Sequence, residues 1–263
     1  MNNTRKRDLL VYGICDALMA FTAWAIFSYK FVINRNFVLL ENPTLQAWGT
    51  AGLIVVGFIL LYTIFDFYTD LYRQSRLATL TRTIFISLLG CLLVVLLIRD
   101  VFMGNTISLW FHFFLWHFFL TALSRMILLT RASRRLKAGS VTFNTIIIGG
   151  DENALELYTE IKSRQKGLGY KFIGFIDSNG SSRNLLEGHL PLLGKLDQLA
   201  AIIVQHKVEE VIIAIETQEH DKLRDILNVL FDFSSNILIK VIPSMYDIML
   251  GTVKMNHVYG AVL

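Results

Sequence analysis

Four long apolar runs fill the first half of the chain, and shorter polar stretches separate them. A helix that crosses about 30 Å of hydrocarbon needs about 17–25 predominantly apolar residues. Each run falls within that range, so the pattern predicts four transmembrane helices. Their spans are expected at about residues 8–29, 47–65, 82–98 and 107–129.

The pattern changes after residue 137. Short aliphatic runs alternate with stretches of helical periodicity, which is typical of βαβ units whose parallel strands are buried on both faces. Strands are expected at 144–150, 170–178, 208–215 and 237–242, and helices at 153–165, 196–205 and 219–233. The chain is therefore predicted to have a membrane domain at 1–137 and an α/β, Rossmann-like module with a doubly wound parallel sheet at 138–263.

Composition agrees with a membrane domain, and charge separates the two parts. Hydrophobic residues make up 54% of the 263 residues, and the mean hydropathy is +0.50. Residues 1–143 hold 14 Lys and Arg against 6 Asp and Glu, whereas residues 144–263 hold 11 against 15. The basic excess of the first part favours contact with anionic headgroups of the lipid bilayer, and the acidic second part argues against nucleic acid as a partner.

Basic residues in the short loops predict the orientation of the helices, because Lys and Arg accumulate on the cytoplasmic side. They cluster before the first span, between the second and third, and after the fourth. The opposite loops carry Lys30, Arg35 and Arg99. Both termini are therefore expected in the cytoplasm.

Ionisable residues inside the predicted spans are candidates for function. Asp16 lies in the first span, where a charge is costly without a partner or a task. It either hydrogen-bonds to a neighbouring helix, which is the simpler interpretation, or serves a substrate or a proton. His112 and His117 are five residues apart, about 140° around a helix, so they do not form one metal-binding face. No metal site is predicted.

Charges of both signs follow the second span, at Asp66, Asp70, Arg73 and Arg76. Their separation by three or four residues predicts an interfacial helix on which opposite charges pair. A solvated, self-paired face and a site for lipid headgroups both agree with this pattern, and the first is the simpler interpretation.

A glycine turn, Gly149-Gly150-Asp151, follows the first expected strand of the module. In Rossmann-like domains such a turn holds a phosphate at the N-terminus of the next helix. Here Asp151 replaces the second glycine of G-x-G-x-x-G, and Asp177, a candidate for a ribose hydroxyl, follows Gly149 by 28 residues instead of about 20. We predict a structural corner; a site for a nucleotide, nucleotide sugar or CoA at Gly149, Gly150, Asp151 and Asp177 is the second hypothesis.

Motifs of known catalytic machinery are missing from the sequence. GxSxG, the P-loop and HExxH do not occur. The neighbouring carboxylates Asp151 and Glu152 open a helix, where they stabilise its dipole. No catalytic residue is assigned.

A family resemblance rests on five segments in addition to the four spans. They are Ile-Ile-Ile-Gly-Gly, Ile-Gly-Phe-Ile-Asp, Leu-Pro-Leu-Leu-Gly-Lys-Leu-Asp, Val-Ile-Ile-Ala-Ile-Glu and Val-Ile-Pro-Ser-Met-Tyr-Asp-Ile-Met-Leu-Gly. Together they resemble the N-terminal part of bacterial polyprenyl-phosphate sugar-phosphate transferases, in which a four-helix membrane region precedes a CoA-binding-like Rossmann module.

The resemblance implies a membrane anchor and regulatory or assembly module in the bacterial inner membrane. The enzymes it resembles transfer a hexose 1-phosphate from a nucleotide sugar to undecaprenyl phosphate and initiate exopolysaccharide, capsule or O-antigen synthesis. Their catalytic domain follows the module, whereas this sequence stops at Leu263. Undecaprenyl phosphate and the nucleotide sugar are thus expected as partners through that domain, and the chain alone is expected to be inactive. A homo-oligomer is left open.

The alternative family is that of the membrane-bound nucleotide-sugar 4,6-dehydratases, which share the four spans and the module. The segments at 245–251 and 257–263 look more like the approach to the transferase domain. The transferase resemblance is therefore preferred.

Overall fold

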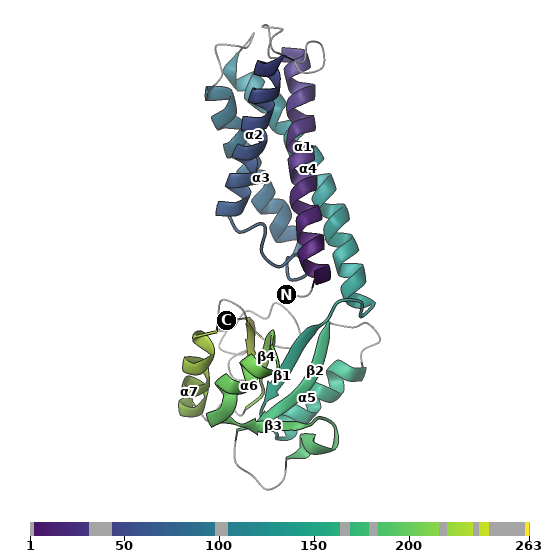
Figure 1. Cartoon of the computed structure of the whole chain (residues 1–263), viewed down its shortest axis with the longest axis vertical. Helices are drawn as coiled ribbons and strands as arrows, with labels where there is room; N and C mark the ends of the chain where they lie inside the picture. Colours follow the sequence, from purple (N-terminus) through teal and green to yellow (C-terminus); the bar gives the residue numbers. More distant parts are fainter. Residues whose placement is uncertain are drawn as a thin grey trace. The chain divides into compact units, whose positions relative to one another are not determined.

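The computed structural model describes residues 3–31, 44–97, 105–163, 169–178, 184–215, 220–233, 237–241 and 261–262. The chain divides into two compact units, Met1–Arg134 and Arg135–Leu263. The first unit is helical, and the second is built from strands and helices (Figure 1).

Four long helices form the first unit: α1 (Asn3–Phe31), α2 (Leu45–Ile64), α3 (Arg76–Leu97) and α4 (Thr106–Lys137). All four are long and apolar enough to cross a membrane. Even the shortest has 20 residues, which at 1.5 Å per residue extend about 30 Å. Within the described residues, the prediction of four apolar spans is confirmed.

Polar residues set the starts of two of these helices. The Ala47 N–H donates to Thr44 Oγ1 at 3.2 Å ahead of α2, and the Ile107 N–H donates to Asn105 Oδ1 at 2.9 Å ahead of α4. Such side chains satisfy backbone donors that have no partner within the helix. The helices also run beyond the predicted spans, with α3 starting before residue 82 and α4 ending after residue 129. Hydropathy marks only the apolar part of a helix, whereas its hydrogen bonds continue through polar ends.

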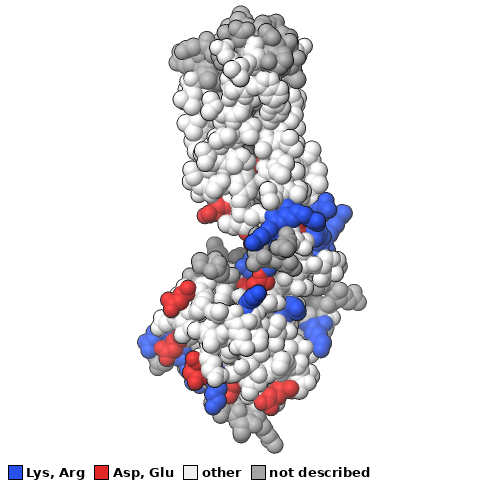
Figure 2. Space-filling model, in the orientation of Figure 1, with Lys and Arg blue, Asp and Glu red and all other residues white. Residues whose placement is uncertain are grey.

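Aromatic side chains fill the centre of the bundle. The ring centroids of Phe27 and Phe113 are 4.9 Å apart, and Trp24 meets Phe113 edge to face at 5.9 Å. Gly90 allows α3 to approach α2, because a Cβ at that position would lie 2.5 Å from Cε1 of Phe58. Outward-facing aliphatic and aromatic residues are exposed, and Figure 2 shows a largely uncharged surface over the helices. Such a surface suits contact with lipid.

The interfacial helix expected around residues 66–76 is absent, and this prediction was wrong. Asp66 has a φ of +54°, turns follow it, and α3 begins at Arg76. Tertiary contacts replace the helical hydrogen bonds: the Arg82 guanidinium donates to the Phe65 carbonyl at 2.5 Å, and the Gln74 amide donates to the Phe67 carbonyl at 2.8 Å. We call residues 65–75 the turn segment.

The second unit contains one six-stranded sheet with the order β3-β2-β1-β4-β5-β6. The first five strands are parallel, and β6 pairs with β5 in the antiparallel direction. The strands are β1 (Phe143–Ile148), β2 (Tyr170–Asp177), β3 (Leu192–Lys195), β4 (Glu210–Ile213), β5 (Leu238–Val241) and β6 (Ala261–Val262). The Rossmann-like α/β class is thereby confirmed.

Helices cover both faces of this sheet. The helix α5 (Glu152–Ser163) packs on one face, and α6 (Leu199–Gln205) and α7 (His220–Phe231) pack on the other. Successive residues of β1 point to opposite faces, so Ile147 joins the α5 side while Ile146 and Ile148 join the α6 and α7 side. Two short 3₁₀ helices, Leu185–Gly188 and Leu196–Gln198, lie before β3 and α6.

Two strands were not anticipated. The strand β3 has four residues, follows Pro191 and contains Gly194, so no apolar alternation marks it. It forms because β2 offers a free edge to pair with. The strand β6 has two residues, too few for any periodicity. The four strands and the helices α5 and α7 that were predicted agree with the structure to within two residues at either end.

Replacing Gly90 with valine is expected to destabilise the bundle by about 1–3 kcal/mol, because the added side chain overlaps the Phe58 ring. Gly57→Val on α2 is the matched control, since a Cβ there meets nothing within 4 Å. Denaturation of the purified chain in detergent measures both. Equal stability of the two variants would contradict the close approach of α2 and α3.

Candidate functional site

A buried ion pair joins α1 to α4 inside the helical unit. Asp16 is 1% exposed and Arg125 is fully buried. The Arg125 Nε and Nη2 groups donate to the two carboxylate oxygens of Asp16 at 3.0 and 2.8 Å. This bidentate geometry satisfies both charges at once. The interpretation that Asp16 hydrogen-bonds to a neighbouring helix agrees with these contacts.

The remaining surface of the Arg125 guanidinium is also occupied. Its Nη1 donates to Thr83 Oγ1 on α3 at 2.7 Å. Its central carbon lies 4.0 Å from the Tyr62 ring centroid and 4.1 Å from that of Phe67. Planar guanidinium groups stack well on aromatic faces, because they are weakly hydrated and are attracted to the π electrons. Arg125 therefore connects all four helices and the turn segment.

His117 extends this polar network by about two helical turns along α4. Its ring is fully buried and stacks on Phe58 with centroids 3.9 Å apart. One ring nitrogen lies 3.1 Å from Ser87 Oγ, and the other lies 3.4 Å from Tyr62 Oη. Because Tyr62 also stacks on Arg125, the ion pair and the histidine share one aromatic side chain.

The turn segment is attached to the first helix by several polar contacts. The Tyr68 hydroxyl donates to Asp16 at 3.1 Å, and the Tyr72 hydroxyl donates to Asp8. Burial and the nearby Asp16 carboxylate raise the pKa of Tyr68, so its hydroxyl keeps the proton that it donates. Asp70 lies 3.7 Å from Arg5 and 3.6 Å from Arg73.

This last contact bears on the charges that follow the second span. Asp70 and Arg73 pair at a separation of three residues, as the sequence pattern suggested, although a turn holds them in place of a helix. Asp70 also pairs with Arg5, which lies near the N-terminus of the chain. The pairing is therefore tertiary as well as local.

Two hydroxyl groups beside this network, one of a tyrosine and one of a threonine, differ from the others. Tyr12 Oη and Thr121 Oγ1 are buried and have no hydrogen-bond partner among the described residues. Tyr12 lies beside Arg125, with 5.7 Å between the guanidinium carbon and the ring centroid. Thr121 lies one helical turn from both His117 and Arg125 on α4. The network therefore retains hydrogen-bonding capacity that the described part of the chain does not use.

The glycine turn of the second unit is occupied by the protein. A Cβ on Gly149, whose φ is +125°, would lie 2.3 Å from the Ala214 carbonyl oxygen. A Cβ on Gly150 would lie 2.3 Å from Asn184 Oδ1, and the Leu185 N–H donates to the Gly150 carbonyl at 2.9 Å. Both glycines thus serve the close approach of neighbouring backbone and side chains.

The two aspartates of the candidate ligand site lie on different elements. Asp151 is partly buried at the start of α5, where its carbonyl accepts from Leu155, and Asp177 is 7% exposed at the end of β2. Asp177 pairs in register with Lys195 of β3. Ligand binding by Gly149, Gly150, Asp151 and Asp177 stays a prediction.

Several residues of the network were missed at the sequence level. Arg125, Thr83 and Tyr68 were not singled out, although the single Arg in the fourth apolar span was a visible counterpart to Asp16 inside the first. His112 lies apart from His117 and is exposed. Its Nδ1 donates to the Ser108 carbonyl at 2.7 Å.

Within the described ranges, no group of three or more His, Cys, Asp or Glu could hold a metal ion.

A known protein family matches most of the chain. A family described as a CoA-binding domain matches residues 63–243, from the end of α2 through α3, α4 and strands β1 to β5. No curated protein matches the sequence.

Replacing Arg125 with glutamine is expected to destabilise the helical unit by about 3–5 kcal/mol, because it leaves the buried Asp16 carboxylate without its charge partner. Asp16→Asn should cost a similar amount. The double variant should lose much less than the sum, since both charges are gone. Denaturation in detergent measures the cycle.

Arg131→Gln is the matched control for this cycle, because Arg131 lies on the same helix and is exposed. Additive losses in the double variant, or an equal loss in the control, would contradict the pairing.

Proposed function

The chain belongs to the CoA-binding domain family, which is found in sugar-transferase-like proteins, and from this premise we propose its function. It is the membrane anchor and regulatory or assembly module of an undecaprenyl-phosphate hexose-1-phosphate transferase. That enzyme initiates exopolysaccharide, capsule or O-antigen synthesis. Undecaprenyl phosphate and a nucleotide sugar are its substrates.

The observation that carries this proposal is the continuity of membrane helices and module within one family match. The matched region includes α3 and α4 together with the parallel strands β1 to β5. Five residues separate the end of α4 at Lys137 from the start of β1 at Phe143. A module tethered so shortly to apolar helices remains at the membrane, where a lipid-linked acceptor also resides.

The state of the glycine turn supports an assembly or regulatory role over a role in chemistry. The space where a Cβ on Gly149 or Gly150 would lie holds atoms of Ala214 and Asn184. We infer that a phosphate at this turn would compete with these atoms. A module of this kind acts by contact with a catalytic partner. One fold can host many unrelated functions, so the Rossmann-like fold of the module does not by itself require ligand binding at the glycine turn.

We also propose the location and orientation that the charges favour. In the described part of the chain, arginines lie at the ends of the apolar spans or beyond them. They are Arg5, Arg73, Arg131 and Arg134. Lys and Arg gather on the cytoplasmic side of such helices. The chain is thus a multi-pass protein of the bacterial inner membrane with both termini in the cytoplasm.

Deletion of the gene is expected to lower the transfer of radiolabelled hexose 1-phosphate from UDP-hexose to undecaprenyl phosphate in isolated membranes. Expression of the full chain should restore it, and so should the control Gly188→Ala, where a Cβ meets nothing within 4 Å. The purified chain alone should give no product. Turnover by the purified chain would sink the proposal of a non-catalytic module.

The same membranes distinguish the dehydratase alternative. Formation of a 4-keto-6-deoxy nucleotide sugar is measured beside lipid-linked sugar. If deletion of the gene abolishes the keto sugar but leaves the amount of lipid-linked sugar unchanged, the chain belongs to a dehydratase and not to a transferase.

Calorimetry on the purified full chain tests the ligand hypothesis. CoA, UDP-glucose and NAD at millimolar concentration are expected to give no heat of binding, because Asn184 and Ala214 fill the glycine turn. Asn184→Gly removes one of these obstacles and serves as the comparison. Binding by the unchanged chain that Gly150→Ala abolishes would instead establish the turn as a ligand site.

A further inference from the structure

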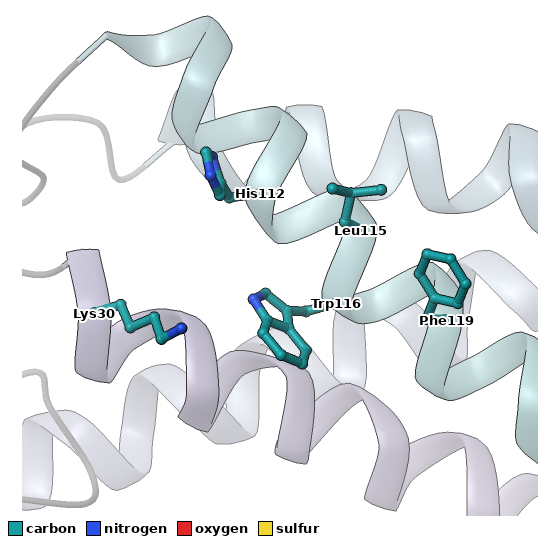
Figure 3. Close-up of a pocket in the computed structure, with 5 residues that line it drawn as sticks. All are labelled: Lys30, His112, Leu115, Trp116 and Phe119. Atoms are coloured by element: carbon teal, nitrogen blue, oxygen red, sulfur yellow. The ribbon is translucent and has the colours of Figure 1, made fainter.

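A pocket of about 440 Å³ opens between the C-terminal end of α1 and the first half of α4. Lys30 of α1 lines it together with His112, Leu115, Trp116 and Phe119 of α4 (Figure 3). Its volume falls within the range of small-molecule sites, about 300–1,000 Å³. The ion pair of Asp16 and Arg125 is not part of its wall.

The pocket is polar at one end and apolar along its length. The residues from α4 recur every three or four positions, so they lie on one face of the helix. From His112 to Phe119 the helix rises about 10 Å, and the wall changes over this length from an imidazole to hydrocarbon and aromatic side chains. In Figure 3 the Lys30 side chain extends toward Trp116, while Leu115 and Phe119 lie farther along α4.

Lys30 supplies the positive charge of this site. Its ammonium nitrogen lies 5.5 Å from the Trp116 ring centroid, within the range of a cation–π contact. Among the described residues, it is the single Lys or Arg at this end of the bundle, because the others of the helical unit lie in α1 before Asp8, near the turn segment, or in α4 from Arg125 onward.

The polar end of the wall also carries His112. Its Nδ1 donates to the Ser108 carbonyl at 2.7 Å, which fixes the ring orientation at the pocket wall. A soluble anion such as a nucleotide would leave the apolar part of the wall unused. A neutral hydrocarbon would leave the ammonium group without its counterion. The ligand that matches both ends carries an anionic headgroup and an acyl chain.

We propose that this pocket binds one anionic phospholipid. The phosphodiester lies at Lys30 and His112, and part of an acyl chain lies against Leu115, Trp116 and Phe119. The site would tie the bundle to a lipid of the leaflet opposite to the Arg5 end of α1. This binding is independent of sugar transfer, so its test does not depend on the proposed function.

Native mass spectrometry of the purified full chain, titrated with phosphatidylglycerol or phosphatidylcholine, measures the binding. The unchanged chain should retain one phosphatidylglycerol more tightly than phosphatidylcholine. Lys30→Ala should weaken phosphatidylglycerol binding about fivefold, since one Lys near a lipid surface contributes about 1 kcal/mol. Lys30→Arg should keep the preference. Equal binding of the two lipids by the unchanged chain would overturn the proposal.

Two matched controls separate the pocket from general attraction. Lys6→Ala removes the same charge from an exposed position at the other end of α1 and should leave the tight site unchanged. Phe119→Ala should weaken both lipids, whereas Phe111→Ala, also exposed on α4 but not in the pocket wall, should weaken neither. An equal effect of Lys6→Ala and Lys30→Ala would refute a local site.

A third arm identifies the source of the phosphate. Undecaprenyl phosphate is added to the chain already loaded with phosphatidylglycerol. Retention of phosphatidylglycerol supports a phospholipid site. Displacement that is lost in Lys30→Ala would assign the pocket to a polyprenyl phosphate and overturn the assignment made here.

Discussion

The helical unit depends on one interaction, the buried ion pair between Asp16 and Arg125. Either charge alone would be expensive inside an apolar bundle, since neither water nor another charge would compensate it. Paired through two hydrogen bonds, and held by Thr83 and Tyr68, the two charges become tolerable in one arrangement only. The pair therefore fixes the rotation of α1 and α4 about their axes, which apolar packing by itself specifies poorly.

The second unit rests on different physics. Its strands are buried on both faces, and aliphatic residues such as Ile146 and Ile147 point alternately to the two helical layers. The hydrophobic effect and the parallel hydrogen-bond ladder dominate here. One buried charge is paired across two strands, since Lys240 Nζ of β5 lies 2.9 Å from Glu210 Oε2 of β4. The glycine turn belongs to this packing: Gly149 admits the Ala214 carbonyl, and Gly150 admits Asn184. Membership of a CoA-binding family thus coexists with a turn that the protein fills itself.

The polar groups of the bundle divide into two kinds. The charged groups of the inner network, Asp16 and Arg125, are satisfied by other side chains, and they stabilise the arrangement of the helices. Lys30 and His112 at the opposite end line an open pocket with an apolar continuation, which suits a lipid. An anchor needs both: a core that holds its helices in one arrangement and a surface that matches the membrane around it. The proposed role in polysaccharide synthesis builds on such an anchor.

The sequence by itself determined the number of apolar spans, the α/β class of the module and the weakness of its phosphate-binding motif. Hydropathy, periodicity and glycine spacing are local properties, which is why they could be read along the chain. The partner of Asp16 was decided by the tertiary structure, because Arg125 is 109 residues away. The same is true of the turn segment, where Arg82 and Gln74 supply hydrogen bonds in place of a helix, and of β3, which forms against the free edge of β2.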